Sequence, residues 1–265
     1  MGFLRRLAGV LAVSALAVVI AGCGTRTTGT QGAGAKVHHR TEAAASSVAT
    51  TTTTTNPNPY SVPASTLVAT MDGNEPGYAT AGAATPSTTV PGSWYGYPSV
   101  LPVIATEPGW LEVRLAQRPN GSTVWVPQAD ATLSNTPYAI VVDLTTMHLL
   151  VYEGGVQLFD FPAGIGAPDD PTPTGQYFIP IGQYPSPGPG YGPFVLVTSD
   201  HSDTITDWEN SGDAIIGIHG PIDSYDDQLI GTTGAAISHG CIRLHDADLA
   251  QLSMIPAGTP LDIVS

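Results

Sequence analysis

The chain has 265 residues, enough for two modest domains, and only 11% of them are charged, while 30 are glycine and 24 are proline. This composition is rich in turns and argues against an all-α fold. The net charge of −14, from 22 acids and 8 bases, excludes a nucleic-acid partner bound by electrostatics. With two cysteines, the chain is neither a disulfide-rich scaffold nor a zinc site with four cysteine ligands.

Residues 1–22 have the pattern of a signal peptide. Arg5 and Arg6 precede an uncharged apolar segment, residues 7–20, that is too short to span a membrane comfortably. Ile-Ala-Gly then leads into Cys23, which resembles the lipobox at which bacterial prolipoproteins are lipidated and cleaved. We therefore expect an exported protein, lipid-anchored through Cys23 to the outer face of the cytoplasmic membrane and facing the cell wall. The alternative is an ordinary cleaved signal that leaves Cys23 as a free or bridged thiol.

Residues 23–62 are rich in threonine and proline, with six consecutive threonines at 50–55 and few large apolar side chains. Such a segment cannot bury enough surface to offset the entropy cost of ordering. It is therefore predicted to be a disordered tether, with a reach of about 35 Å. The paired histidines 38 and 39 lack further metal ligands nearby, which favours an inert pair.

Residues 63–135 contain short β-like runs separated by turns, the longest at 100–106 and 110–115. Arg-Pro-Asn-Gly at 118–121 predicts a hairpin, because Asn-Gly adopts the backbone angles that tight hairpin turns require. The segment resembles bacterial Src-homology-3-like barrels, which are often attached to wall-acting enzymes. We expect a small β-barrel-like domain here, whose role is either wall binding or packing against the next domain.

Residues 136–265 show clearer strand alternation, which predicts a mostly β domain with one or two short helices. The Leu spacing and leading acids of residues 246–254 indicate one of these helices. The Pro- and Gly-rich loop at 182–193 is a candidate lid beside a cleft. The predicted strands lie at 138–143, 146–152, 156–161, 194–198 and 214–218.

Cys241 has no disulfide partner in this domain and lies in Ile-Ser-His-Gly-Cys-Ile-Arg-Leu, residues 237–244. The preceding glycine lets backbone N–H groups approach the sulfur, as an oxyanion site requires. A cysteine nucleophile reacts as the thiolate, so we expect a nearby imidazole that lowers its pKa. His219 and His239 are close in sequence, and His219 ends an apolar strand before Gly-Pro, which places it at a sheet edge. From these residues alone, an unreactive buried cysteine is the alternative.

The full string resembles the L,D-transpeptidase catalytic domain of the YkuD type. That signature is a His-Gly, a spacer, and Ser/Thr-His-Gly-Cys followed by an apolar residue and Asn or Arg. Here 18 residues separate His219 from the Ser-His-Gly-Cys-Ile-Arg run at 238–243. The resemblance covers about residues 138–264. It implies that Cys241 is the nucleophile, that His219 is the general base, and that the carbonyl of Gly220 orients His219.

By the same resemblance, backbone amides around His239, Gly240 and Cys241 form the oxyanion hole, with Ser238 and His239 fixing the turn. Arg243 stands where many members have Asn, and its guanidinium is expected to bind a substrate carboxylate with two hydrogen bonds. Because the spacer is at the long end of the family's range, the loop at 223–234 is expected to be locally remodelled.

The function implied is a peptidoglycan L,D-transpeptidase. Cys241 attacks the bond between the L-centre of diaminopimelate and D-Ala in a donor tetrapeptide stem and forms a thioester, which an acceptor amine of a second stem resolves. No cofactor is required, and carbapenems are expected to acylate the same cysteine. Two alternatives stay open: an L,D-carboxypeptidase or exchange enzyme acting on the same stems, and a non-catalytic wall-binding lipoprotein.

Other charged residues are not assigned to the site. The run Asp-His-Ser-Asp at 200–203 mimics a metal-ligand cluster, but the acids that follow it favour a solvated loop, and no metal site is predicted. His148 faces outward from a predicted strand, and His245 lies at a helix start. Neither is predicted to be catalytic.

Overall fold

The computed structural model describes residues 60–265, which belong to one compact unit. The predicted signal peptide, Cys23 and most of the predicted tether lie outside the described residues. No helix within residues 60–265 is long and apolar enough to cross a membrane.

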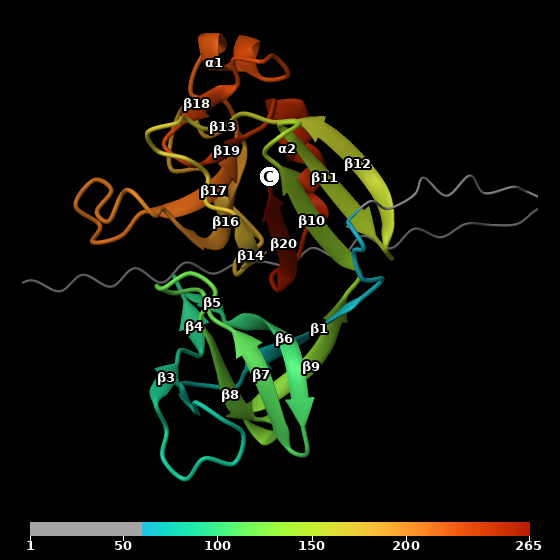
Figure 1. The fold of residues 1–265 in the computed structure, drawn as a ribbon, viewed down its shortest axis with the longest axis vertical. Helices are drawn as coiled ribbons and strands as arrows, with labels where there is room; N and C mark the ends of the chain where they lie inside the picture. The colour runs from blue at the N-terminus through green and yellow to red at the C-terminus, as the bar shows by residue number, and fades with distance from the viewer. Residues whose placement is uncertain (1–59) are drawn as a thin grey trace, which may run out of the picture. The chain divides into compact units, whose positions relative to one another are not determined.

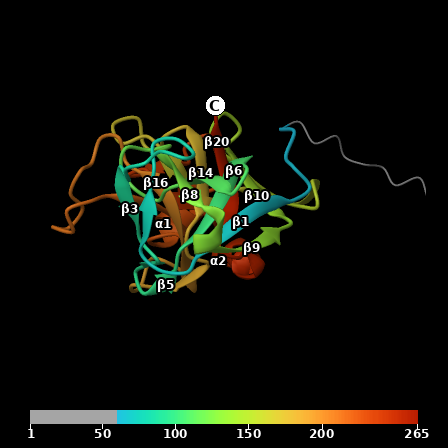
Figure 2. The ribbon, with the colours of Figure 1, turned by 90° about the horizontal axis from the view of Figure 1, so that it is seen from below.

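The first part of the described chain is a five-stranded antiparallel sheet in the order β8-β7-β6-β1-β9 (Figure 1). Every second residue of β7 and β8 is buried, as expected for strands with one face on a core. Seen from below, β9 lies beside β1 (Figure 2). The strands are β1 (Thr66–Met71), β6 (Val100–Glu107), β7 (Trp110–Arg114), β8 (Thr123–Pro127) and β9 (Ala131–Thr136).

Two short hairpins and one helical turn complete this first part, and the hairpin expected around 118–121 joins β7 to β8. Gly121, with φ of +78°, supplies the left-handed backbone that its turn requires. The small elements are β2 (Glu75–Gly77), β3 (Thr88–Val90), β4 (Ser93–Trp94), β5 (Tyr97–Pro98) and the 3-10 helix η1 (Gln128–Asp130).

The second part contains a mixed five-stranded sheet in the order β12-β11-β10-β20-β14. Strands β10 and β20 are parallel, and the other neighbours are antiparallel. The last strand, β20, lies inside the sheet between β10 and β14. The strands are β10 (Tyr138–Asp143), β11 (His148–Glu153), β12 (Val156–Pro162), β14 (Gly175–Ile179) and β20 (Thr259–Val264).

A second, four-stranded sheet faces it in the order β15-β16-β17-β19, and a short parallel pair, β13 and β18, lies alongside. The two sheets share one apolar core, in which Val142 and Leu149 of the first meet Leu196, Ile218 and Ile242 of the second. The strands are β13 (Ile165–Gly166), β15 (Gln183–Pro185), β16 (Phe194–His201), β17 (Ile215–His219), β18 (Ala236–Ser238) and β19 (Ile242–Arg243).

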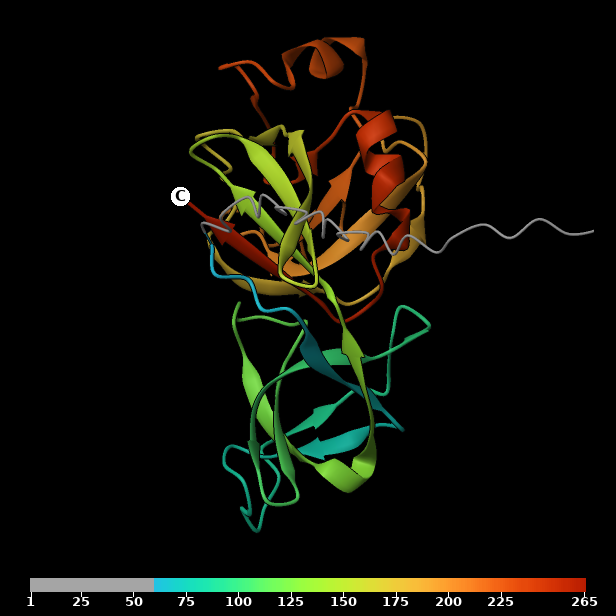
Figure 3. The same ribbon diagram turned by 90° about the vertical axis from the view of Figure 1, so that its right-hand side faces the viewer.

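Helices are few and short: α1 (Ser224–Leu229), α2 (Asp246–Gln251) and the 3-10 helix η2 (Leu252–Met254). The predicted helix at 246–254 is present as α2 and η2, and Leu249 and Leu252 join the core. Figure 3 shows α2 as the red coil beside the orange strands. The predicted mostly β fold class is confirmed. Helix α1 was not predicted, because it buries no residue and so leaves no apolar periodicity.

Two expectations need correction. Asp200, His201 and Ser202 are not part of a solvated loop: all three are almost completely buried at the end of β16, and only the residues after them are exposed. The predicted tether also ends earlier than residue 62. Tyr60 and Val62 pack against the outer face of β10 and β11, and the Tyr60 hydroxyl donates to Asp143 Oδ2 at 2.8 Å.

Candidate active site

The pairing of β17 with β19 assembles the site. These strands are parallel, with His219 opposite Arg243, and Cys241 lies just before β19. Side chains two residues apart share one face of a strand, so Cys241 and Arg243 point to the same side as His219. The Gly217 N–H donates to Cys241 Sγ at 3.4 Å. All three side chains line one cavity of about 400 Å³.

His219 is held in one tautomer. Its ring is buried, and Nδ1 lies 2.6 Å from the Gly220 carbonyl oxygen. A carbonyl only accepts, so Nδ1 carries the proton and Nε2 keeps its lone pair. The pKa of His219 is lowered to about 4, mainly by burial; the bond to Gly220 opposes this shift, and the charge of Arg243 adds to it. The imidazole is therefore neutral at pH 7, as a general base must be.

Gly220 fits this role because nothing larger can occupy its position. A Cβ there would lie 2.8 Å from the Gly192 Cα and would collide with the Asp246 carboxylate. The Gly220 N–H donates to the Tyr191 carbonyl at 3.0 Å, and the Tyr191 ring lies 4.9 Å from the His219 ring. The loop at 182–193 thus packs directly on the base; that it opens and closes as a lid stays a prediction.

The turn that carries Cys241 is fixed by hydrogen bonds. Ser238 Oγ donates to the Cys241 carbonyl at 2.5 Å and accepts from the Gly240 N–H at 3.1 Å. Gly240 has a φ of +109°, and a Cβ there would lie 2.6 Å from Ile216 Cδ1. The site therefore requires glycine before the nucleophile.

The amide of Gly240 is already bonded to Ser238 Oγ, so it is not free for an oxyanion in this arrangement. Within residues 60–265, the amides of His239 and Cys241 have no hydrogen-bond acceptor. These two are the donors that remain for an oxyanion among the three that the resemblance implied. The His239 side chain is exposed and contacts Trp208, with 5.2 Å between the ring centres and 50° between the ring planes, so it does not compete with His219 as the base.

The Cys241 thiol is not held as the thiolate that the sequence led us to expect. Burial raises the pKa of Cys241, Asp200 adds to the rise, and the Gly217 N–H and Arg243 oppose it. With the pKa of His219 also lowered, the resting pair is a neutral thiol and a neutral imidazole rather than a thiolate and an imidazolium. The proton transfer therefore belongs to the attack itself.

Arg243 is buried, and one of its guanidinium nitrogens already has protein partners. Its Nη1 pairs with Asp226 Oδ2 and lies 3.4 Å from the Ile237 carbonyl, while Nε has no partner in the described part of the chain. The expected two-pronged bond to a substrate carboxylate stays a prediction, and Asp226 already holds one of the nitrogens. Asp226 lies on α1, which forms within the long spacer, capped by Asp223.

Sequence reasoning missed several residues of the site. Thr172 Oγ1 donates to the Gly240 carbonyl at 2.7 Å and accepts from the Gly166 N–H at 2.9 Å. Thr172 thus links the turn that carries Cys241 to strand β13. Asp226 and Tyr191 were missed because neither belongs to a motif. Apart from the catalytic groups, the cavity wall is mainly aromatic and aliphatic, and it includes Tyr95, Tyr184, Tyr191, Trp208, Ile216 and Ile222.

Two carboxylate oxygens near residue 200 have protein partners, whereas the buried Asp200 Oδ2 has none in the described part of the chain. Asn120 Nδ2 donates to Asp200 Oδ1 at 3.1 Å, and His201 Nδ1 lies 2.9 Å from Asp213 Oδ2. In residues 60–265, no group of three or more His, Cys, Asp or Glu side chains is arranged to hold a metal ion.

Comparison with known proteins agrees with this geometry. Residues 137–263 match the family model of YkuD, the L,D-transpeptidase catalytic domain. This part of the chain is similar to YkuD-type L,D-transpeptidase catalytic domains. Members of this family are cysteine-dependent acyltransferases. The match does not include residues 60–136. The role of the first sheet therefore has to be inferred from the contacts that its residues make.

Two curated relatives match the domain. A protein named "Putative L,D-transpeptidase YkuD" from Bacillus licheniformis is 30% identical over 128 residues, which are 48% of this chain and 66% of that protein. Its namesake from Bacillus subtilis is 29% identical over the same length. The match thus spans slightly less than two thirds of each relative. Among solved structures, an L,D-transpeptidase from Mycobacterium smegmatis is 19% identical, with 62% of this chain and 82% of that chain covered and a TM-score of 0.38.

Proposed function

We propose that this protein is a peptidoglycan L,D-transpeptidase that works through a thioester on Cys241. The observation that carries the proposal is the locked tautomer of His219. Its Nδ1 proton is bound to the Gly220 carbonyl, which leaves Nε2 as a neutral base in the cavity that Cys241 lines. The L,D-transpeptidase domain match supports the same chemistry.

In the first half-reaction, His219 Nε2 accepts the Cys241 proton as Sγ attacks the carbonyl carbon at the L-centre of diaminopimelate. The negative charge on the carbonyl oxygen is stabilised by the amides of His239 and Cys241. The C–N bond to D-Ala then breaks, and the imidazolium returns its proton to the leaving amine. The products are free D-Ala and an acyl thioester on Cys241.

In the second half-reaction, the amine of another stem peptide attacks the thioester carbonyl and gives up its proton to His219. The C–S bond breaks, the sulfur recovers the proton, and an amide joins two diaminopimelate residues. Because the base starts and ends neutral, each half-reaction moves a single proton through Nε2.

Mass spectrometry of the detergent-solubilised full chain with a carbapenem tests this proposal. We expect one adduct that maps to Cys241, is absent in Cys241→Ala, and forms much more slowly in His219→Ala. With muropeptides that bear tetrapeptide stems, the expected product is a cross-linked dimer. No adduct in the folded wild type, or a tripeptide as the only product, would contradict the transpeptidase assignment.

We also propose the location that the leader pattern indicates: export, lipidation at Cys23 and attachment to the outer face of the cytoplasmic membrane. The basic residues, the apolar segment and the small residues before Cys23 support it. An acyl label incorporated into the wild type but not into Cys23→Ser is the expected result, and equal labelling of both would contradict it.

For residues 63–135 we propose a Src-homology-3-like domain. The five-stranded antiparallel sheet and its tight hairpins support this, as does the weak sequence pattern. Sedimentation of the protein with purified cell-wall sacculi tests the wall-binding role that the resemblance implies. If the protein does not sediment with the sacculi, wall binding is contradicted, and packing against the next domain is the role that remains.

A further inference from the structure

One wall of the catalytic cavity is formed by a loop whose own residues are mostly exposed. Residues 203–213 connect β16 to β17, and all of them except Ile205 and Asp213 are exposed. The loop nevertheless supplies Ile205 and Trp208 to the cavity, and the Trp208 ring contacts the ring of His239, two residues before the nucleophile. Because so little of the loop is buried, polar contacts at its base must determine its position.

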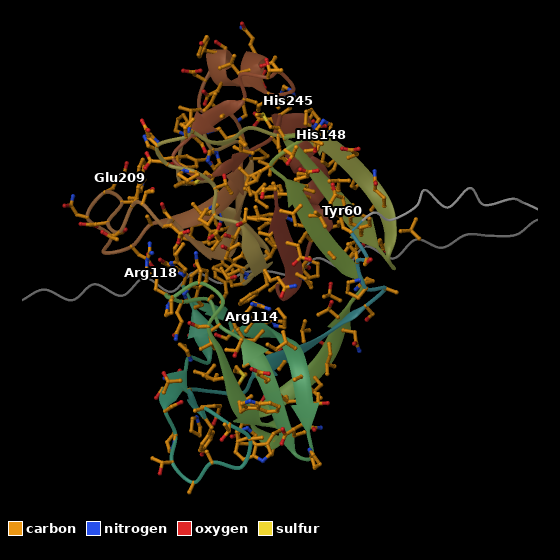
Figure 4. The ribbon with its side chains drawn as sticks, viewed as in Figure 1. Tyr60, Arg114, Arg118, His148, Glu209 and His245 are labelled. Atoms are coloured by element: carbon orange, nitrogen blue, oxygen red, sulfur yellow. The ribbon has the colours of Figure 1, made fainter. Side chains whose placement is uncertain are left out.

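One such contact comes from the second part of the chain, where Thr204 Oγ1 donates to Asp170 Oδ1 at 2.9 Å, and several others come from the first sheet. Arg118, in the turn between β7 and β8, donates from Nη1 to the Ser202 carbonyl at 2.8 Å and from Nη2 to the Ile205 carbonyl at 3.0 Å. Its Nε donates to Asp213 Oδ1 at 2.8 Å. One guanidinium thus binds both ends of the loop. In Figure 4, Arg118 lies on the side of the first sheet and Glu209 lies on the loop itself.

Asn120, in the same turn, binds the strand from which the loop leaves. Its amide nitrogen donates to the His201 carbonyl at 2.7 Å and to Asp200 Oδ1 at 3.1 Å, and its oxygen accepts from the His201 N–H at 2.9 Å. Asn120 therefore pairs with the backbone of His201 as a neighbouring strand would. Burial raises the pKa of Asp200 to about 8, so an amide rather than a cation is a fitting partner for it at neutral pH.

We propose that Arg118 and Asn120 are positioning residues for the reaction at Cys241. The 118–121 turn of the first sheet fixes the loop at 203–213, and this places Trp208 and His239 beside the nucleophile. The proposal rests on the transpeptidase function proposed above. It assigns to the first sheet a part in the active site, in addition to any binding to the cell wall.

The effect of Arg118 is expected on geometry rather than on overall stability. Arg118 and Asp213 are each about one-third exposed, and such ion pairs add little to the free energy of folding. The two carbonyl contacts are different, because a planar guanidinium that bridges two backbone carbonyls restricts the backbone directly. Lysine, with a single ammonium group, cannot reproduce this bridge.

The chain offers a matched control. Arg114 also reaches from the first sheet to the second part of the chain, where its Nη2 donates to Gln176 Oε1 at 3.1 Å on β14. Gln176 does not line the cavity. Arg114→Ala therefore removes a contact of the same kind between the two parts without touching the loop at 203–213.

The test measures two quantities in the full-length protein: carbapenem acylation of Cys241 at saturating inhibitor, and backbone hydrogen exchange of residues 203–213. In Arg118→Ala and Asn120→Ala we expect faster exchange in the loop and about tenfold slower acylation, equivalent to about 1.4 kcal/mol. Arg118→Lys is expected to recover little of either, and Arg114→Ala to match the wild type in both, with all four variants folded by circular dichroism.

The proposal is overturned if loop exchange and acylation in Arg118→Ala match the wild type, or if Arg114→Ala slows acylation as much as Arg118→Ala does. If Arg118→Ala does not fold, Asn120→Ala decides by the same two measurements, because it changes the same turn. Wild-type protein that is never acylated would contradict the proposed function instead. The exchange measurement would still show whether the turn fixes the loop.

Discussion

At the residue scale, the protonation of His219 sets the acid limit of the proposed reaction. Its pKa is lowered to about 4 by burial, compared with about 6.5 for an ordinary histidine. Only the neutral ring accepts the thiol proton. Protonation of His219 therefore reduces the activity only below about pH 5, and not already near pH 6.5. We expect the rate of carbapenem acylation to stay level on the acid side down to about pH 5 and to decline around pH 4.

The check is the rate constant of acylation measured from pH 3.5 to 7 by stopped-flow fluorescence, with the fold followed by circular dichroism at each pH. A half-maximal rate near pH 6.5 in folded protein would show that the imidazole is exposed to solvent. Such a result would contradict the buried, Gly220-bound arrangement.

At the element scale, α1 contributes a buried ion pair and a largely exposed side-chain contact. Asp226 pairs with the buried Arg243, whereas Asp227 Oδ1 lies 2.6 Å from His245 Nδ1 in a largely exposed pair. Removing one partner of a buried pair leaves an uncompensated charge and costs about 3–5 kcal/mol, whereas an exposed pair contributes about 0–1 kcal/mol.

Asp226→Ala is therefore expected to lower the free energy of unfolding by about 2–4 kcal/mol, given that Asp226 itself retains some exposure. Asp227→Ala, one residue along the same helix, is expected to change it by less than about 1 kcal/mol. Urea unfolding followed by tryptophan fluorescence measures both. Equal losses in the two variants would show that helix propensity, rather than the pair with Arg243, explains the effect.

At the scale of the whole molecule, β14 connects the cores of the two parts. Tyr177 packs in the core between the sheets of the second part, while its neighbour Phe178, fully buried, packs in the core of the first sheet. Successive side chains of a strand point to opposite faces, so one strand serves both cores. The buried hydroxyls of Thr136 and Thr259, 3.5 Å apart, form another link.

We expect Phe178→Ala to destabilise the protein by about 3–5 kcal/mol, because it leaves a large cavity in the first core. Shared packing also predicts that wild-type residues 60–265 unfold in one cooperative transition. Calorimetry measures both, with exposed Val156→Ala on β12 as a control that should change little. Two separate wild-type transitions would show that the two parts fold independently.

The residues to which we assign the proposed chemistry could be named from the sequence because they are close together along the chain. Ser238, Gly240 and Cys241 form one turn, and the glycine before a cysteine already indicates the backbone that the turn needs. His219 followed by Gly220 likewise places a base next to the carbonyl that holds it. Alternating apolar residues were sufficient to predict the mostly β fold, since a strand's period of two is visible locally.

What the sequence could not show depends on contacts between distant residues and on burial. Thr172 reaches Gly240 across 68 positions, and Arg118 reaches Ser202 across 84, without a local signal for either pair. The pKa values of Cys241 and His219 moved away from the expected thiolate pair because desolvation disfavours charge, and desolvation exists only once the chain is folded. Local pattern determined the strands and the reacting groups; tertiary structure decided their protonation, the loop beside them and the part played by the first sheet.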